Sequence, residues 1–293
     1  TGWAFMAPFA ILFAFVFLLP IIWAVYSSFF RQVSQGGGLY GGGELVNEFV
    51  GFQNFQYVIT SGKFWTGVGH VLLYTVVQVP IMIIAALALA MVIDSFVVKH
   101  VTGFRLGYFL PYAIPGVVAS IIWVYLYNGQ ISPIVKGLES IGIHVDFFAN
   151  NVVLGSMANI TTWTFTGYNM LIFLAALQAI PHDLYEAARI DGAGEARIFF
   201  TIVLRILSPA MVTIFLFLFV ATWNNFLLPL MMVSSDTLKP VTLGLYGMVS
   251  LATFTDRGAL MMGALLGVLP VIVIFLGLQR YWQSGLAAGA VKG

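Results

Sequence analysis

The 293-residue sequence contains no cysteine and very little charge. The missing cysteine excludes disulfides, thiolate metal sites and a cysteine nucleophile. Charged residues make up 8% of the chain, whereas a soluble domain usually has about 25%. A soluble surface with so little charge would be largely apolar and would aggregate, but a lipid-facing surface would not. The formal net charge of +1 gives no basic patch of the kind that binds nucleic acid.

Long apolar stretches take up most of the chain, which is 60% apolar with a mean hydropathy of +0.98. A bilayer core about 30 Å thick needs about 20 helical residues to cross it, and backbone groups cannot go unpaired in lipid. Six stretches meet this length: residues 3–30, 66–93, 104–127, 152–180, 199–226 and 259–281. The sequence therefore predicts an all-α, polytopic membrane protein with six transmembrane helices.

We expect two parts in this chain. Residues 1–65 would form the first transmembrane helix and a glycine-rich external loop, and residues 66–293 a core of five transmembrane helices. Because glycine runs at 36–38 and 41–43 do not hold a fixed backbone cheaply, we expect segment 31–65 to be a mobile loop. Six prolines inside the spans are either ordinary membrane-helix prolines or bends that open a cavity: Pro20, Pro80, Pro111, Pro115, Pro209 and Pro270.

The distribution of Lys and Arg predicts the orientation of the chain. Loops 94–105 and 181–205 with the C-terminal tail hold seven of the twelve, and the other three loops hold five. The positive-inside rule places the first set in the cytoplasm, and an even number of spans then places both termini there. Since residue 1 is threonine, we expect a natural start upstream. We expect no signal peptide, because no basic region precedes the first apolar stretch.

The cytoplasmic segment 181–200 is predicted to form two short helices joined by a turn. Pro181 can open the first helix, and residues 191–194 supply the turn. Glu186 and Arg189 are three residues apart and can pair on the surface. An apolar stripe at helical spacing consists of Leu184, Ala187, Ala188 and Ile190. Such a surface needs either a partner protein or the membrane interface.

The spacing in this segment resembles a known signature. Glu186, Ala187 and Ala188 are followed by three residues, Gly192, nine residues, Ile202, one residue and Leu204. This pattern is similar to the coupling loop of binding-protein-dependent ABC importer permeases, which docks into a cleft of the ATP-binding subunit. The resemblance implies a coupling loop at 181–200 whose ATPase contacts are Glu186, Ala187, Ala188, Asp191 and Gly192. The family often has proline directly after the leucine, where this chain has Arg205, so the bend entering the fifth span is expected to be shifted.

Four further stretches resemble the maltose-type, carbohydrate-importing branch of that family: residues 50–57, 109–116, 223–226 and 279–293. The last two are similar to its second type of permease subunit. The resemblance implies a type I ABC importer permease fold in the cell membrane of a prokaryote. The implied partners are a second homologous permease subunit, two copies of an ABC ATPase and an external solute-binding protein.

The chain has no Gly-x-x-x-x-Gly-Lys-Ser/Thr loop that could cradle a nucleotide phosphate. We therefore expect no cofactor in this chain and no enzymatic activity of its own. ATP and Mg²⁺ are expected in the partner ATPase, and the expected function is to form the translocation path for a sugar or oligosaccharide.

Polar residues at membrane depth are candidates for the solute path, because a path through lipid must replace water. The predicted path residues are Tyr168, Asn169, Trp223, Asn224 and Asn225, with Asn159, Thr162, Thr166, Tyr74 and Gln78 as further candidates. Amides, hydroxyls and aromatic rings together suit a neutral polyol. In the alternative interpretation these residues only hold helices together, or the sister permease alone holds the solute.

Other substrates and other functional classes remain as alternatives. An importer for glycerol phosphate, an amino sugar or an anionic saccharide would belong to the same family. An ion-coupled secondary transporter would normally need an acidic group inside a span, and every Asp and Glu here falls in a loop or at a span edge. An intramembrane enzyme would need a buried nucleophile, metal ligands or an acid–base pair, and the chain has no cysteine, no His-x-x-x-His pair and no carboxylate pair within the predicted spans.

Overall fold

A computed structural model describes residues 2–35, 44–95, 100–250 and 256–290. The helices are α1 (Gly2–Phe13), α2 (Leu19–Ser27), α3 (Gln53–Thr60), α4 (Gly62–Asp94), α5 (Val101–Ala113), α6 (Gly116–Tyr127), α7 (Pro133–Ser140), α8 (Val153–Gln178), α9 (His182–Ile190), α10 (Glu195–Ile198), α11 (Leu204–Trp223), α12 (Leu227–Met232), α13 (Val241–Ser250) and α14 (Arg257–Ala290). A π-helical segment at Ala14–Leu18 joins α1 to α2, another at Phe199–Val203 joins α10 to α11, and a 3₁₀ turn lies at Asp236–Leu238. The strands are β1 (Phe30–Gln35) and β2 (Glu44–Phe49).

Five helical stretches of the described chain are long and apolar enough to cross a membrane: Gly2–Ser27, Gly62–Asp94, Val153–Gln178, Glu195–Trp223 and Arg257–Gln279. The pair α5 and α6 makes a sixth if it is counted as one span. The chain divides into two compact units, residues 1–70 with 237–271 and residues 71–236 with 272–293. The predicted division into residues 1–65 and 66–293 stays a prediction, because compactness does not test it.

The first unit contains structure where a mobile loop was expected. β1 and β2 form an antiparallel hairpin in which Phe30 lies opposite Phe49, and α3 follows. The expectation of a mobile loop over 31–65 was therefore wrong for the described part of it. The glycine runs at 36–38 and 41–43 lie outside the described residues. The facing rings of Phe30 and Phe49, with centroids 5.5 Å apart, stabilise the hairpin as cross-strand aromatic pairs do.

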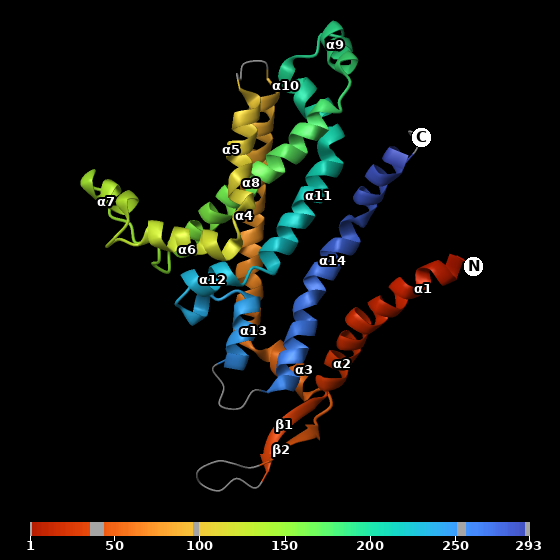
Figure 1. Ribbon diagram of the computed structural model, residues 1–293, viewed down its shortest axis with the longest axis vertical. Helices are drawn as coiled ribbons and strands as arrows, with labels where there is room; N and C mark the ends of the chain where they lie inside the picture. The colour runs from red at the N-terminus through yellow and green to blue at the C-terminus, as the bar shows by residue number, and fades with distance from the viewer. Residues whose placement is uncertain (1, 36–43, 96–99, 251–255, 291–293) are drawn as a thin grey trace. The chain divides into compact units, whose positions relative to one another are not determined.

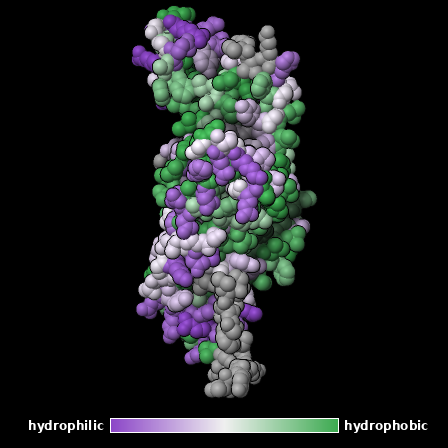
Figure 2. All heavy atoms as spheres, turned by 90° about the vertical axis from the view of Figure 1, so that its left-hand side faces the viewer, coloured by the Kyte–Doolittle hydropathy of each residue, from purple (hydrophilic) through white to green (hydrophobic). Residues whose placement is uncertain are grey.

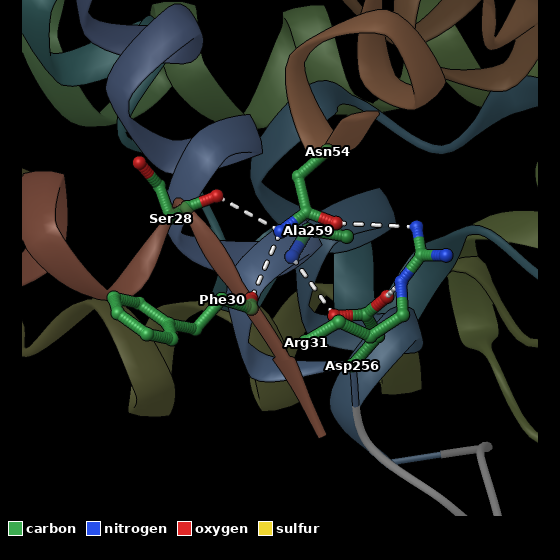
Figure 3. Close-up of polar contacts among 6 residues, drawn as sticks. All are labelled: Ser28, Phe30, Arg31, Asn54, Asp256 and Ala259. Carbon is green, nitrogen blue, oxygen red and sulfur yellow. Dashed lines mark hydrogen bonds and ion pairs between the residues drawn. The ribbon is translucent and has the colours of Figure 1, made fainter. Parts of the chain in front are cut away.

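A polar clasp of Arg31, Asn54 and Asp256 ties this hairpin to α3 and to the start of α14 (Figure 3). Arg31 Nε donates to Asp256 Oδ2 at 2.9 Å, and Arg31 Nη2 donates to Asn54 Oδ1 at 3.2 Å. Asn54 is fully buried, and its Nδ2 donates to the carbonyl oxygens of Ser28 at 2.8 Å and Phe30 at 2.9 Å. One amide thus satisfies two backbone carbonyls where the chain passes from α2 into β1.

The clasp also fixes the first turn of α14. Asp256 Oδ1 accepts a hydrogen bond from the backbone N–H of Ala259 at 3.1 Å, as an N-cap residue does. At Gly258 a Cβ would lie 1.8 Å from the carbonyl oxygen of Phe30 and 2.4 Å from Asn54 Nδ2. Only glycine therefore allows the α14 backbone to lie directly against β1.

Asn54→Ala is expected to destabilise the first unit by about 3 kcal/mol, because it leaves two backbone carbonyls without their buried donor. The measurement is the thermal unfolding midpoint of the purified protein in detergent, which should fall by several degrees. Gln56→Ala, two residues away on the exposed side of α3, is the matched control and should leave the midpoint within one degree or so. Equal midpoints for the two variants would contradict a stabilising role for the clasp.

The second unit is built around α4, α8 and α11 (Figure 1). Their buried apolar side chains form one cluster, in which Met82, Met170, Phe173, Leu207 and Ile214 are fully buried. On another side, α5 packs against α8 so closely that the backbones touch at Gly167 and Tyr108. The core of this unit is therefore a helical layer in which a small residue sets the distance between two helices.

Two predicted spans are broken in the structure. The third was predicted as one stretch over residues 104–127 in which Pro111 and Pro115 could make bends, and α5 ends at Ala113 while α6 begins at Gly116 with a bend of 96° between them. Pro111 lies in the last turn of α5 and Pro115 precedes α6 in an extended conformation, so neither supplies the donor that a continuous helix needs. The fifth predicted span stops as a helix at Trp223, and α12 follows after residues 224–226.

The surface of the second unit is mixed in character. Figure 2 shows hydrophilic side chains gathered over α7 and at the end that carries α9, with hydrophobic side chains between them. α7 was not predicted from the sequence. It is an amphipathic helix that Ser132 caps by accepting from the N–H groups of Ile134 and Val135. A short amphipathic helix flanked by isoleucines has the composition of an interfacial element.

Candidate functional site

The segment after α8 forms the predicted helix, turn and second helix. α9 begins after Pro181, and its C-terminus closes around Gly192, which has φ +79°. The N–H of Ala193 donates to the carbonyl oxygen of Ala188 at 2.9 Å, and the N–H of Gly192 donates to that of Arg189 at 3.0 Å. These two bonds and the left-handed glycine make a Schellman cap, which stops a helix at a defined residue. The turn is therefore fixed by its backbone.

An ion pair spans this turn. Arg189 Nε donates to Glu195 Oε1 at 2.9 Å, which ties the last turn of α9 to the first turn of α10. The spacing of Glu186 and Arg189 allowed a pair between them, but the hydrogen-bonded ion pair of Arg189 is with Glu195, which the turn brings within reach of the guanidinium.

The five predicted ATPase contacts lie together on α9 and its turn. Glu186, Ala187, Asp191 and Gly192 are exposed, and Ala188 is half-buried. None of the nine residues of α9 is fully buried, and Ile190 is 86% exposed. The predicted apolar stripe thus lies largely uncovered on this chain, apart from Ala188. Contact with an ATPase stays a prediction.

A cavity of about 420 Å³ lies between α6, α8 and the chain that joins α11 to α12. Its lining residues are Tyr112, Ile114, Gly116, Ala119, Ser120, Ile160, Thr161, Thr164, Phe165, Ala221, Asn224, Asn225, Phe226, Leu227 and Leu228. The two broken spans create this cavity: the bend between α5 and α6 turns α6 across α8, and the break after Trp223 places two asparagines at the wall. None of the lining residues carries a charge.

One wall of the cavity is aromatic. The ring of Tyr112 stacks on Tyr168 with centroids 4.4 Å apart and planes 14° from parallel. Phe165 meets Tyr112 edge-on at 5.8 Å. Tyr168 and Phe165 therefore hold the ring of Tyr112, which is 39% exposed, at the cavity wall. A fixed, partly exposed ring can cover the apolar face of a ligand at little entropic cost.

The hydroxyl groups in the wall are arranged as acceptors. Ser120 Oγ donates to the carbonyl oxygen of Gly116 at 2.8 Å, and Thr164 Oγ1 donates to that of Ile160 at 2.9 Å. Thr161 Oγ1 likewise donates to Met157, so it accepts from the Tyr74 hydroxyl at 2.9 Å. Each hydroxyl has committed its single proton, so the lone pairs left on Ser120 and Thr164 can only accept from a ligand. The cavity suits a solute rich in O–H donors.

The structure brings together only some of the predicted path residues. Asn224 and Asn225 line the cavity, and Tyr168 stands behind Tyr112. Asn169 is 1% exposed and its Nδ2 donates to Met82 Sδ at 3.5 Å, while Trp223 is 3% exposed. Asn169 and Trp223 therefore lie in the packed interior of the second unit.

Two further candidates tie helices together. Gln78 Nε2 donates to the carbonyl oxygen of Ala158 at 2.9 Å and also to Thr162 Oγ1, which joins α4 to α8. The polar and aromatic cavity residues missing from the predicted path are Tyr112, Ser120, Thr161, Thr164, Phe165 and Phe226. For Tyr112 a signal was present, because prolines at 111 and 115 flank it and predict a broken helix.

The sequence profile of the family described as "Binding-protein-dependent transport system inner membrane component" matches residues 57–287. The sulfoquinovosyl glycerol transport system permease protein SmoG of Agrobacterium fabrum is 30% identical over 257 residues, which cover 86% of this chain and 80% of the relative. The sn-glycerol-3-phosphate transport system permease protein UgpA of Brucella abortus is 33% identical over 205 residues, covering 70% and 67%.

The fold is similar to that of a solved importer. A chain of the bacterial alginate ABC transporter in complex with alginate pentasaccharide-bound periplasmic protein superposes with a TM-score of 0.77 at 17% identity. The match covers 95% of this chain and 92% of the other. This confirms the predicted helical permease fold of type I ABC importers.

Proposed function

Because this chain belongs to the family of binding-protein-dependent transport system inner membrane components, we propose that it lines the path of a neutral sugar or oligosaccharide. It is the permease subunit of an ABC importer, a multi-pass transport component and not an enzyme. The proposed substrate class rests on the cavity between α6, α8 and the chain that joins α11 to α12.

The uncharged cavity with one aromatic wall is the observation that supports a neutral sugar. Sugars expose apolar C–H faces and many hydroxyl donors, which the Tyr112 ring and the acceptor oxygens of Ser120 and Thr164 can match. The amides of Asn224 and Asn225 add groups of the type that recognise hydroxyls. An anionic solute buried here would find no cation in the described wall, and burying an unpaired charge is costly.

A second substrate class is favoured by the relatives. SmoG is named for sulfoquinovosyl glycerol, UgpA for sn-glycerol 3-phosphate, and the solved importer for alginate. Glycerol phosphate and alginate are acidic, so an anionic saccharide or glycerol phosphate is the alternative. In that case a second permease subunit would have to supply the positive charge that this wall lacks.

The proposed assembly contains a second homologous permease, two copies of an ABC ATPase and an external solute-binding protein. ATP and Mg²⁺ would bind in the ATPase, and α9 with its turn would dock there through Glu186, Ala187, Ala188, Asp191 and Gly192. Closure of the ATPase pair on ATP would move α9 and favour one of two arrangements of the spans. We further propose that both termini face the cytoplasm of a prokaryotic cell, as the Lys and Arg distribution predicts.

Tyr112→Ala is expected to lower uptake of a neutral oligosaccharide about tenfold, because loss of a fixed aromatic contact removes about 1.4 kcal/mol of binding free energy. Uptake is measured in proteoliposomes that contain all subunits, with binding proteins loaded with neutral and with anionic saccharides. Tyr125→Ala removes an exposed tyrosine of α6 outside the cavity and is the control. If the unaltered importer took up only anionic solutes, that result would contradict a neutral sugar as the substrate.

A further inference from the structure

α9 is held to the helical bundle by few side chains. Of its nine residues, seven are exposed, and only Tyr185 and Ala188 are half-buried. Ala188 has a single methyl group, so Tyr185 supplies the large contact. A helix that must pass its motion to the bundle needs such a packed side-chain contact.

Tyr185 packs against the buried cluster formed by α4, α8 and α11. That cluster includes Ile93 near the end of α4 and Leu177 near the end of α8. Asp94 is the last residue of α4, and its Oδ1 accepts a hydrogen bond from Gln178 Nε2, at the end of α8, at 3.4 Å. Burial raises the pKa of the Tyr185 hydroxyl, and the negative charge of Asp94 raises it further.

The other attachments of α9 lead elsewhere. Its first residue follows α8 directly in the chain through residues 179–181. Its last turn is tied by Arg189 and Glu195 to α10, which continues into α11. These two attachments run through the backbone and the turn. The packing of α9 on the buried cluster of α4, α8 and α11 runs through Tyr185, and Figure 1 shows α9 at the end of the bundle where α4 stops.

We propose that Tyr185 is the positioning residue that passes a displacement of α9 to the buried cluster at the end of α4. The inference rests on the proposed docking of α9 to an ATPase. A rigid aromatic ring wedged against the ends of packed helices cannot slide past them, because cores are close-packed. When α9 is pushed or pulled, the ring carries the motion into α4, whose buried face lies in the core cluster with α8.

The test compares Tyr185→Ala, Tyr185→Phe and the control Tyr125→Ala in the reconstituted complex of all subunits. The readouts are solute molecules imported per ATP hydrolysed and the cross-link from Ala188→Cys to the ATPase, which is specific because this chain has no cysteine of its own. Tyr185→Ala should keep the cross-link and ATP hydrolysis while the ratio falls about tenfold. Tyr185→Phe, which keeps the ring, should retain most of the ratio, and Tyr125→Ala should not change it.

An unchanged ratio in Tyr185→Ala with an intact cross-link would overturn the role of Tyr185 but leave the docking of α9 standing. If Ala188→Cys in the otherwise unaltered complex gave no cross-link to the ATPase, the docking itself would be refuted. If Tyr185→Ala failed to assemble, Tyr185→Leu would replace it in the test, with the number of solute molecules imported per ATP hydrolysed as the readout. A normal ratio with leucine overturns the proposal, because a flexible aliphatic group then serves as well as the wedged ring.

Discussion

Glu186→Lys is expected to reduce solute uptake by the assembled importer about tenfold or more, while ATP hydrolysis continues. Glu186 is exposed on α9, so the substitution removes no core contact and should change stability by about 0.5 kcal/mol at most. Reversing a charge inside an interface costs several kcal/mol, because the partner surface then faces a like charge. The effect should therefore appear in coupling and leave folding unaffected.

The matched control for this change is Glu139→Lys. Glu139 is also an exposed glutamate on a short helix, but it lies on α7, outside the predicted coupling loop. Uptake of labelled solute and release of phosphate are followed together in proteoliposomes that hold every subunit. Normal uptake by Glu186→Lys, or an equal loss in Glu139→Lys, would argue against docking through α9. Gly192→Asp should act in the same direction, since it adds a side chain and a charge at φ +79°.

Gly167→Ala is expected to give the largest loss of stability among small substitutions in the second unit. A Cβ at this position would lie 1.8 Å from the carbonyl oxygen of Tyr108, 2.3 Å from its carbonyl carbon and 2.9 Å from the nitrogen of Phe109. All three atoms are backbone, so no side chain can rotate away, and α5 would have to move from α8. Overpacking of this kind costs about 3 kcal/mol or more.

Gly155→Ala is the matched control on the same helix. A Cβ at Gly155 meets nothing within 4 Å, and alanine is a better helix former than glycine by about 1 kcal/mol. Both variants replace a glycine of α8 by alanine. Gly167→Ala should lower the stability of the protein, whereas Gly155→Ala should raise it. Thermal unfolding and the yield of the assembled complex in detergent measure both. Equal behaviour of the two would show that the close approach of α5 and α8 does not set the fold.

The spans and their class could be predicted because membrane hydropathy is a local property. A stretch of about 20 apolar residues must be helical in lipid whatever lies beside it. Five of the six predicted spans correspond to single long helical stretches, and the other to the bent pair α5 and α6. The turn after α9 was equally local, since Gly192 and its neighbours close it through backbone bonds within six residues. Both predictions needed no knowledge of distant contacts.

The breaks within spans three and five could be predicted only in part. Prolines at 111 and 115 indicate a bend, but the size of that bend depends on the packing of α6 across α8. Asn224 and Asn225 are turn-favouring residues and Pro229 follows, but the apolar sequence on both sides favoured one continuous span. The hairpin was missed because the segment is rich in glycine, although the strands themselves contain aromatic and branched residues.

The sequence by itself determined that the chain crosses a membrane, how many times it can do so, and where an exposed helix and turn interrupt the crossings. Only the tertiary structure decided which polar groups meet. Arg31 and Asp256 are 225 residues apart in the chain, and Tyr112 faces a cavity while Asn169 is packed against Met82. Hydropathy and turn chemistry act over a few neighbouring residues, whereas the direction in which a polar side chain points depends on how its helix is rotated against others.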